Sequence, residues 1–401
     1  MGNLEHFSDW HDAVTTSSEE KITTATRTLL ERMHDTAASM SWPGEQRLQA
    51  LPGNALNHSH WSFTTRRVDR ARVKSLLEGN LQPQVGDLLL ARIETLGHHG
   101  KLQLVDGRRR RLFRGDLVIV TYANRYACEQ FEAEVPQSLA SCHLVAGGGI
   151  AALALSWHDR IVKGPTTIQP LGLLADDQGR RINIGDFSLP ALTAPPAIPP
   201  LFAVVGTAMD AGKTETAAHL LRGLKSTGRR TGYIKITGTG AGGDTWLLQD
   251  AGADCVLDFT DAGLPSTYRA PVARIEHAME LLVGHMASAG VDAIVMEVAD
   301  GVYQQETAQL VRSATFAQRV SGIVLAARDA MGASAGIRAL DDQPRPVLAL
   351  SGLLSASPLQ RREAQAALGI DSFSREELAS AAVARRLLAG AAGTGQREMA
   401  Q

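Results

Sequence analysis

The stretch from Leu201 to Thr216, LFAVVGTAMDAGKTET, constrains the fold of this chain more than any other. Its first five residues form an apolar run that predicts a buried strand, and a loop bounded by Gly206 and Gly212 follows. A helix is predicted to begin at Lys213. A loop between a strand and a helix N-terminus suits phosphate, because its backbone N–H groups and the helix dipole both face the anion. The stretch therefore predicts a phosphate-binding loop.

The side chains of this loop fit a nucleotide with bound Mg²⁺. Lys213 can reach the β- and γ-phosphates, and the Thr214 hydroxyl can bind the metal. Five residues separate the two glycines, where the usual pattern has four. A glycine-rich turn followed by a chance Lys-Thr pair would explain the glycines but not GKT at a helix start. The residues expected to surround the phosphates are Gly206, Thr207, Asp210, Ala211, Gly212, Lys213, Thr214 and Glu215.

After residue 200, continuous apolar runs alternate with helical patterns. This alternation predicts an α/β domain over residues 201–388, with a doubly wound, mostly parallel sheet. The ligands of such sheets bind beyond the carboxyl ends of the strands, so functional residues are expected there. Strands are predicted at 201–205, 231–236, 254–258, 292–297, 321–327 and 346–351, and helices at 213–226, 244–251, 271–289, 304–317 and 358–368.

Three charged residues occupy such positions. Lys235 ends the second strand, Asp244 opens the helix after it, and Glu297 ends the fourth strand. Asp244 and Glu297, with Thr214, would give Mg²⁺ the hard oxygen ligands it prefers. Lys235 and Lys213 would be the catalytic residues that neutralise charge during phosphoryl transfer. Plainer interpretations remain open, with Asp244 as a helix cap and Lys235 as a surface charge.

These residues resemble a family that contains dethiobiotin synthetase and the cobyrinic and cobyric acid amide synthases. The resemblance covers residues 201–388 and implies a P-loop fold, an Mg-ATP site and a homodimer. The family has GT-x-x-x-x-GKT, a Gly-Tyr-Lys segment, an acidic helix start and a glutamate at a strand end. In this chain these are Gly206, Thr207 and Gly212-Lys213-Thr214, then GYIK ending at Lys235, then Asp244 and Glu297.

A second resemblance concerns the acceptor substrate. The stretches TGTG, Thr237 to Gly240, and LDF, Leu257 to Phe259, are similar to a P-loop family that includes D-glutamate N-acetyltransferases. Polar residues after the strands are the expected acceptor contacts, although an ordinary polar connection would also explain them. They are Thr237, Asp258, Ser266, Thr267, Tyr268 and Asp300.

The sequence pattern of the first half of the chain differs from that of residues 201–388. Residues 1–80 predict an arm with short helices at about 17–33 and 68–77, and residues 81–190 predict a smaller β-rich, barrel-like domain from runs of period two. Within it, the apolar, glycine-containing stretch 143–155 favours a tightly packed helix. The arginines of 108–111 would alternate across a strand, so one face could bind phosphate or RNA, although a solvated hairpin explains them too. A Pro-rich linker is expected at 188–200 and a disordered tail at 389–401.

Bulk properties limit the partners. The net charge of −2 argues against nucleic acid, and no apolar run reaches membrane-spanning length. The N-terminus does not resemble a signal peptide, so a cytoplasmic location is expected. The predicted function is an Mg-ATP-dependent ligase that activates a carboxylate or carbamate of a small acceptor for C–N bond formation. Two alternatives remain: an N-acyltransferase whose loop binds coenzyme A, and a nucleotide switch that regulates a partner.

Overall fold

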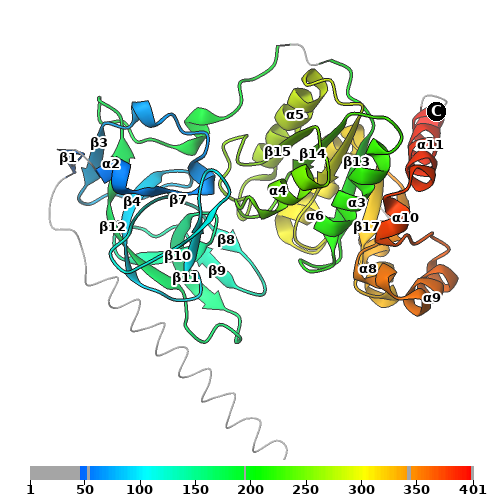
Figure 1. Ribbon diagram of the computed structural model, residues 1–401, viewed down its shortest axis with the longest axis horizontal. Helices are drawn as coiled ribbons and strands as arrows, with labels where there is room; N and C mark the ends of the chain where they lie inside the picture. The colour runs from blue at the N-terminus through cyan, green and yellow to red at the C-terminus, as the bar shows by residue number, and fades with distance from the viewer. Residues whose placement is uncertain (1–45, 52–54, 194–195, 341–344, 399–401) are drawn as a thin grey trace, which may run out of the picture.

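The computed structural model describes residues 46–51, 55–193, 196–340 and 345–398. Figure 1 shows two halves side by side, an N-terminal half built of strands and a C-terminal half of helices around a sheet, joined by an extended linker. The fold class predicted from the sequence is confirmed. The helix predicted at about 17–33 and residues 399–401 of the predicted tail lie outside the described residues. No described helix is both long and apolar enough to cross a bilayer.

The C-terminal sheet contains all six strands that the sequence predicts. They pair in the order β15-β14-β16-β13-β17-β18, and every pair is parallel. The carboxyl ends of the strands therefore meet at one edge, where Lys235 lies opposite both Glu297 and Asp258. The bounds are β13 (Leu201–Gly206), β14 (Thr231–Lys235), β15 (Cys255–Asp258), β16 (Ala293–Glu297), β17 (Gly322–Ala326) and β18 (Val347–Ser351).

Helices cover both faces of this sheet. Alternate side chains of β13 enter different cores: Ala203 packs in the cluster that contains α5 residues, and Phe202 in the cluster that contains α3 residues. This double burial explains why the strands are continuous apolar runs. The helices are α3 (Lys213–Lys225), α4 (Gly243–Asp250), α5 (Val272–Ser288), α6 (Gln305–Val311), α7 (Ala314–Arg319), α8 (Ala330–Leu340), α9 (Pro358–Leu368), α10 (Arg375–Leu378) and α11 (Ala381–Glu398), with a 3₁₀ turn η4 (Leu353–Ala356).

Two helix predictions in this half need correction. The helix predicted over 304–317 is two helices, because the Ser313 side chain accepts the backbone N–H of Phe316 and starts α7 anew. The tail predicted to be disordered from 389 is helical as far as Glu398. Leu387 and Ala391 of this helix pack in the α3-side core, so burial of its apolar face stabilises it despite its glycines.

The N-terminal half is organised around a closed ring of strands. β4 pairs with β7, β7 with β11, β11 with β10, β10 with β12, and β12 returns to β4. Closure leaves no free edge between these strands. The elements are β1 (Arg47–Ala50), α2 (Ala55–His58), β2 (His60–Trp61), η1 (Phe63–Thr65), η2 (Arg70–Arg72), β3 (Ser75–Glu78), β4 (Leu88–Thr95), β5 (Lys101–Gln103), β6 (Arg109–Arg111), β7 (Leu117–Tyr122), β8 (Arg125–Tyr126), β9 (Phe131–Glu134), β10 (Cys142–Ala146), β11 (Ile150–Trp157), β12 (Thr166–Ala175) and η3 (Ile184–Phe187).

Two further predictions in this half were wrong. The helix predicted over 68–77 is the short turn η2 followed by β3, because β3 pairs with both β1 and β12 and tertiary pairing overrides local propensity. The helix predicted over 143–155 is the hairpin β10–β11, with the three glycines as its turn. Gly149 has a φ of 101°, which a helix cannot accommodate and which glycine adopts readily.

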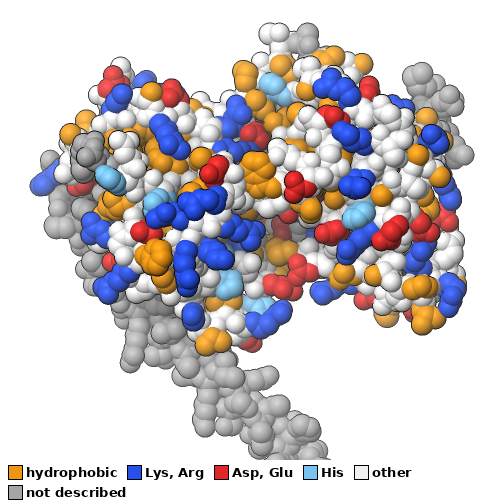
Figure 2. All heavy atoms as spheres, viewed as in Figure 1, with side chains coloured by type: hydrophobic (Ala, Val, Ile, Leu, Met, Phe, Trp, Pro, Cys, Tyr) orange, Lys and Arg blue, Asp and Glu red, His pale blue; other side chains and the backbone are white. Residues whose placement is uncertain are grey.

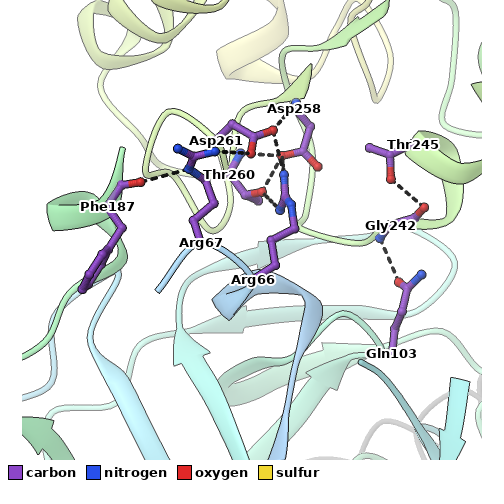
Figure 3. A network of polar contacts seen from close by, with 9 residues as sticks. All are labelled: Arg66, Arg67, Gln103, Phe187, Gly242, Thr245, Asp258, Thr260 and Asp261. Atoms are coloured by element: carbon purple, nitrogen blue, oxygen red, sulfur yellow. Dashed lines mark hydrogen bonds and ion pairs between the residues drawn. The ribbon is translucent and has the colours of Figure 1, made fainter. Parts of the chain in front are cut away.

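The two halves touch through ion pairs and through close backbone contacts. Arg66, just after η1, pairs with Asp258 at 3.1 Å and with Asp261 at 2.7 Å, as Figure 3 shows. Gln103 of β5 accepts the backbone N–H of Gly242 at 2.8 Å. The glycine turn of the β10–β11 hairpin also reaches the C-terminal half, and a Cβ added at Gly148 would lie 1.9 Å from the Gly240 carbonyl oxygen.

We expect Gly148→Ala to lower the free energy of unfolding by about 1–3 kcal/mol, because the added methyl forces the two backbones apart. Gly147→Ala is the matched control, since its Cβ would meet nothing closer than 3.8 Å. That neighbouring change is expected to cost less than about 0.5 kcal/mol. Urea denaturation of both variants measures the difference, and equal losses would contradict the close contact.

Candidate functional site

The loop after β13 has the geometry of a phosphate-binding loop. Gly212, the residue before α3, has a φ of 91°, a left-handed conformation that glycine adopts without strain. A Cβ at Gly206 would lie 2.7 Å from the Lys213 side chain, so this glycine leaves room for the lysine to cross the loop. Lys213 begins α3 with its N-terminal amides toward the loop. The predicted strand, loop and helix therefore occur at the predicted residues.

The Lys213 side chain is enclosed by this loop. Its ammonium donates to the carbonyl oxygens of Ala208 at 2.7 Å and Met209 at 3.1 Å, and only 3% of the residue is exposed. Burial lowers the pKa of Lys213, although Glu297 and Asp300 oppose this effect. A buried cation held only by neutral carbonyls and more distant carboxylates is poised to receive an anionic phosphate.

Glu297, at the end of β16, lies beside the start of α3. Its Oε1 accepts from the Thr214 hydroxyl at 3.1 Å, and its Oε2 accepts from the Tyr233 hydroxyl at 2.8 Å. Burial raises the pKa of this carboxyl, and Lys235 opposes that change. The structure thus brings together the two predicted metal ligands Thr214 and Glu297.

Lys235 and Asp244 form an ion pair with each other at the same edge of the sheet. Burial disfavours the charged form of Lys235, but the carboxylates of Asp244 and Glu297 outweigh it and raise the pKa of this lysine. Asp244 is the second residue of α4, as the sequence predicts, but its side chain is engaged by a lysine rather than by the helix backbone.

The donor set fits Mg²⁺ bound together with a nucleotide. Within the described part of the chain, no three His, Cys, Asp or Glu side chains cluster closely enough to hold a metal by themselves. Mg²⁺ usually takes one or two carboxylates, keeps several waters and completes its shell with substrate phosphates. Thr214 and Glu297, already in contact, match that requirement, and Asp244 is the second available carboxylate.

A cavity of about 990 Å³ opens in front of this cluster, between the two halves of the molecule. The C-terminal half lines it with Asp210, Lys213, Thr214, Lys235, Asp244 and Glu297. The β-rich half supplies the facing wall, which includes Lys101, Arg109, Arg111 and Arg125. The volume is at the upper end of the range for small-molecule sites, about 300–1,000 Å³.

The predicted acceptor contacts do not all reach this cavity. Asp300 lines it and has a φ of 64°, and burial raises the pKa of its carboxyl to about 6. Asp258 instead pairs with Arg66, and the Tyr268 hydroxyl donates to Glu132 of the β-rich half at 3.2 Å. Thr237, Ser266 and Thr267 are buried beside the cavity but not in its lining. Their roles as acceptor contacts stay predictions.

The predicted phosphate-binding set also divides. Thr207 donates its backbone N–H to Ala326, and Ala211 is buried under the loop. Asp210 is exposed at the cavity mouth. Glu215 is half exposed and lies 3.7 Å from the Arg375 guanidinium of α10, so its carboxylate contacts a neighbouring helix and does not line the cavity.

The facing wall was not assigned to the site from the sequence. Arg109 and Arg111 of β6 share one face of the β5–β6 hairpin and line the cavity, as the alternation in the arginine run allows. Arg125 and the His98–His99 pair also line it. The arginine run carried a signal of period two, but nothing around Arg125 in the sequence marks it as part of a site.

Comparisons with known proteins identify no specific family. A scan of protein-family models and a search of curated proteins returned no match. Solved structures match at low similarity, and the chain spans about half the length of the first two described here. The signal recognition particle receptor FtsY from Elizabethkingia anophelis matches at 15% identity over 38% of this chain and 49% of that chain, with a TM-score of 0.28. The signal recognition particle 54 kDa protein from Aeropyrum pernix in complex with GDP matches at 18% identity over 51% of this chain and 50% of that chain, with a TM-score of 0.32. The kinase domain of the Escherichia coli tyrosine kinase ETK matches at 13% identity over 38% of this chain and 68% of that chain, with a TM-score of 0.29. The P-loop α/β assignment therefore rests on the geometry of residues 201–214 and on the parallel sheet of this chain.

Proposed function

We propose that this chain is an Mg-ATP-dependent enzyme that transfers the γ-phosphoryl group to a carboxylate or carbamate oxygen of a small acceptor, activating it for C–N bond formation. The observation that supports this most is the shared cavity. Lys213, Lys235 and the Thr214–Glu297 pair meet at the carboxyl edge of a parallel sheet and open into a space large enough for an acceptor beside the nucleotide. Ligands of such sheets bind at this edge.

Each group has a role in the transfer. Loop amides between Ala208 and Thr214 hold the phosphates, since the Thr207 amide already donates to Ala326, and Lys213 contacts the transferred group from inside the loop. Thr214, Glu297 and Asp244 would hold Mg²⁺, which would supply positive charge to offset the charge of the phosphates. Lys235 stabilises the charge that develops on the phosphoryl oxygens, since the carboxylates around it keep it protonated.

The chemistry balances without a protein nucleophile. An acceptor carboxylate oxygen attacks the γ-phosphorus, the bond to the β–γ bridging oxygen breaks, and ADP leaves with that electron pair. An amine then attacks the acyl carbon, inorganic phosphate leaves, and the amine loses a proton. Phosphoryl transfer depends on positioning and charge stabilisation, which the lysines and the loop provide.

A ligand panel with full-length protein tests the proposal. We expect ATP with Mg²⁺ to stabilise the protein by about 2.7 kcal/mol at a hundredfold excess over Kd. Removing Mg²⁺ with EDTA should abolish most of this gain, because the Thr214–Glu297 pair would then face the phosphates without the ion. Differential scanning calorimetry with ATP, GTP, ADP and acetyl coenzyme A, each with and without Mg²⁺, makes the measurement.

The panel, together with an assay of ADP and phosphate release, also separates the alternatives. Stabilisation by acetyl coenzyme A alone would overturn the proposal in favour of acyl transfer. Nucleotide binding with slow hydrolysis that responds to no small carboxylate and amine would overturn the ligase chemistry and leave a nucleotide switch. An ADP and phosphate yield that rises with a carboxylate and an amine supports the proposal.

A further inference from the structure

Arg125 is a buried cation in the wall that faces the phosphate-binding loop. It belongs to β8 of the β-rich half, is 7% exposed, and lines the cavity that Lys213 also lines. Neither the loop motif nor the Mg²⁺ ligands account for an arginine at this place. Its hydrogen bonds and its charge therefore need an explanation of their own.

The donors of Arg125 are incompletely satisfied. A guanidinium has five N–H groups. One Nη2 hydrogen bond goes to Gln130 Oε1 at 2.7 Å, and Nη1 lies 3.0 Å from His99 Nε2. The buried Nε has no hydrogen-bond partner among the described residues. Buried polar atoms of this kind are rare in proteins because each unmade bond costs free energy.

Two groups compete for the His99 Nε2 atom that contacts Arg125. His99 Nε2 also lies 2.8 Å from the Val145 carbonyl oxygen. If Nε2 carries a proton it donates to Val145, and then it cannot accept from Arg125. If it carries none, it accepts from Arg125 and makes no hydrogen bond to the Val145 carbonyl. In the first tautomer, Gln130 is the one side chain among the described residues that accepts from Arg125.

Arg125 also lacks an ion-pair partner among the described residues, and its guanidinium carbon lies 6.0 Å from the centre of the Phe131 ring. No carboxylate in the described part of the chain forms an ion pair with it, whereas Arg66, also largely buried, pairs with both Asp258 and Asp261. Burial lowers the pKa of Arg125 to about 9, and Asp300 opposes this only in part. A cation in such surroundings favours an anion that brings both charge and hydrogen-bond acceptors.

The surroundings of Arg125 favour an anion over a neutral ligand. Lys101, Arg109, Arg111 and Lys163 line the same cavity from the same half. Figure 2 shows Lys and Arg side chains gathered on this half beside the hollow between the two halves. All four acidic residues of the cavity lining, Asp210, Asp244, Glu297 and Asp300, come from the opposite wall. There Asp244 is already engaged by Lys235, and Glu297 by Thr214 and Tyr233.

We propose that Arg125 binds an oxyanion, a carboxylate or a phosphate, carried by the acceptor at a point remote from the reacting oxygen. The β-rich half is then the part of the enzyme that selects an anionic acceptor and orients it toward Lys213. The identity of the ligand as an acceptor rests on the proposed function, but the oxyanion site itself stands on Arg125 and its unmade hydrogen bonds. A planar guanidinium suits this role because it can contact two oxygens at once.

The test uses full-length protein saturated with Mg²⁺ and the non-hydrolysable nucleotide AMP-PNP, so that the loop is occupied. Inorganic phosphate and succinate are titrated separately by isothermal calorimetry at constant ionic strength. We expect at least one of them to bind, and Arg125→Met to weaken that binding about tenfold or more. Phosphate alone binding indicates a phosphorylated acceptor, and succinate binding indicates a carboxylate.

Arg92→Met is the matched control, because Arg92 is exposed on β4 outside the cavity lining. It should bind both probes as the wild type does. The ligand-free Arg125→Met protein should melt at or above the wild-type temperature, since the change removes an unpaired buried charge. Arg125→Lys keeps the positive charge but loses the planar guanidinium that can contact two oxygens at once. Its affinity for the anion should be intermediate, and it provides a second folded variant.

The outcomes are decisive for Arg125 and separate from the nucleotide proposal. If neither probe binds the wild type, or if Arg125→Met binds as tightly as Arg92→Met, the oxyanion site is overturned. A lower melting temperature for ligand-free Arg125→Met, with unchanged anion binding, would show that the arginine serves the fold. If AMP-PNP does not bind but phosphate binding still depends on Arg125, the proposed function fails and the anion site stands.

Discussion

Lys213→Ala is expected to lower kcat for ATP turnover about a thousandfold, while the protein keeps its fold. The ammonium is held inside the loop by two carbonyl oxygens, and the proposed function assigns it to the transferred phosphoryl group. Burial already lowers the pKa of this lysine, so its charge is not a source of stability in the empty protein. The loss should therefore fall on catalysis and nucleotide affinity. Steady-state kinetics and a urea denaturation curve measure the two effects on the same preparation.

Arg222→Ala provides the control for this experiment. Arg222 is exposed on α3, the same helix that begins with Lys213. Turnover by this variant should stay within about twofold of the wild type, since surface changes away from a site have small effects. Turnover by Lys213→Ala that matches this control would contradict the role given to the loop.

Arg66→Met is expected to lower the free energy of unfolding by about 3–5 kcal/mol. Arg66 contacts Asp258 at the end of β15, and Asp261 and the Thr260 hydroxyl in the turn after it (Figure 3). Burial and the neighbouring Asp258 carboxylate raise the pKa of Asp261, so the two carboxylates depend on a counter-charge. Without Arg66 they remain buried and repel each other. Chemical denaturation followed by intrinsic fluorescence measures the loss.

Arg67→Met is the adjacent control. Arg67 lies 3.6 Å from Asp261 and donates to the Phe187 carbonyl at 3.0 Å, and its side chain is 35% exposed. Its removal should cost about 1 kcal/mol or less, because Arg67 is partly exposed and Asp261 keeps its closer pair with Arg66. Similar losses in the two variants would show that the Arg66 network adds nothing beyond an exposed ion pair.

The α/β half could be predicted closely because its signals are local. Each strand is a continuous apolar run, and the apolar residues of the helices recur at helical spacing. The loop motif fixes where β13 ends and α3 begins. The β-rich half could be predicted only in character. Whether Gly147 to Gly149 form a helix or a hairpin turn depends on the partners of β10 and β11, which lie far away in the sequence.

The same distinction applies to the site. Lys235 and Glu297 end strands of one parallel sheet and Lys213 follows the loop after another, so the rule that strand ends meet at one edge was enough to group them. Arg125 and Arg109 reach the cavity because the β-rich half packs against that edge, and no local pattern encodes this packing. The same rule does not show whether a strand-end carboxylate is free to bind a ligand. Asp258 ends a neighbouring strand, but its carboxylate pairs with Arg66.

The contact between Gln103 and Gly242 affects how this protein can be divided. Gly242 is the N-cap residue directly before α4, which begins at Gly243, and Asp244 lies two residues after Gly242. The backbone N–H at this helix start finds its acceptor in a side chain from the β-rich half (Figure 3). A truncated protein that begins at the linker would lose that acceptor and expose the apolar surface around it to water. Measurements on such a fragment would therefore misrepresent the intact protein, and the two halves are best expressed and studied as one chain.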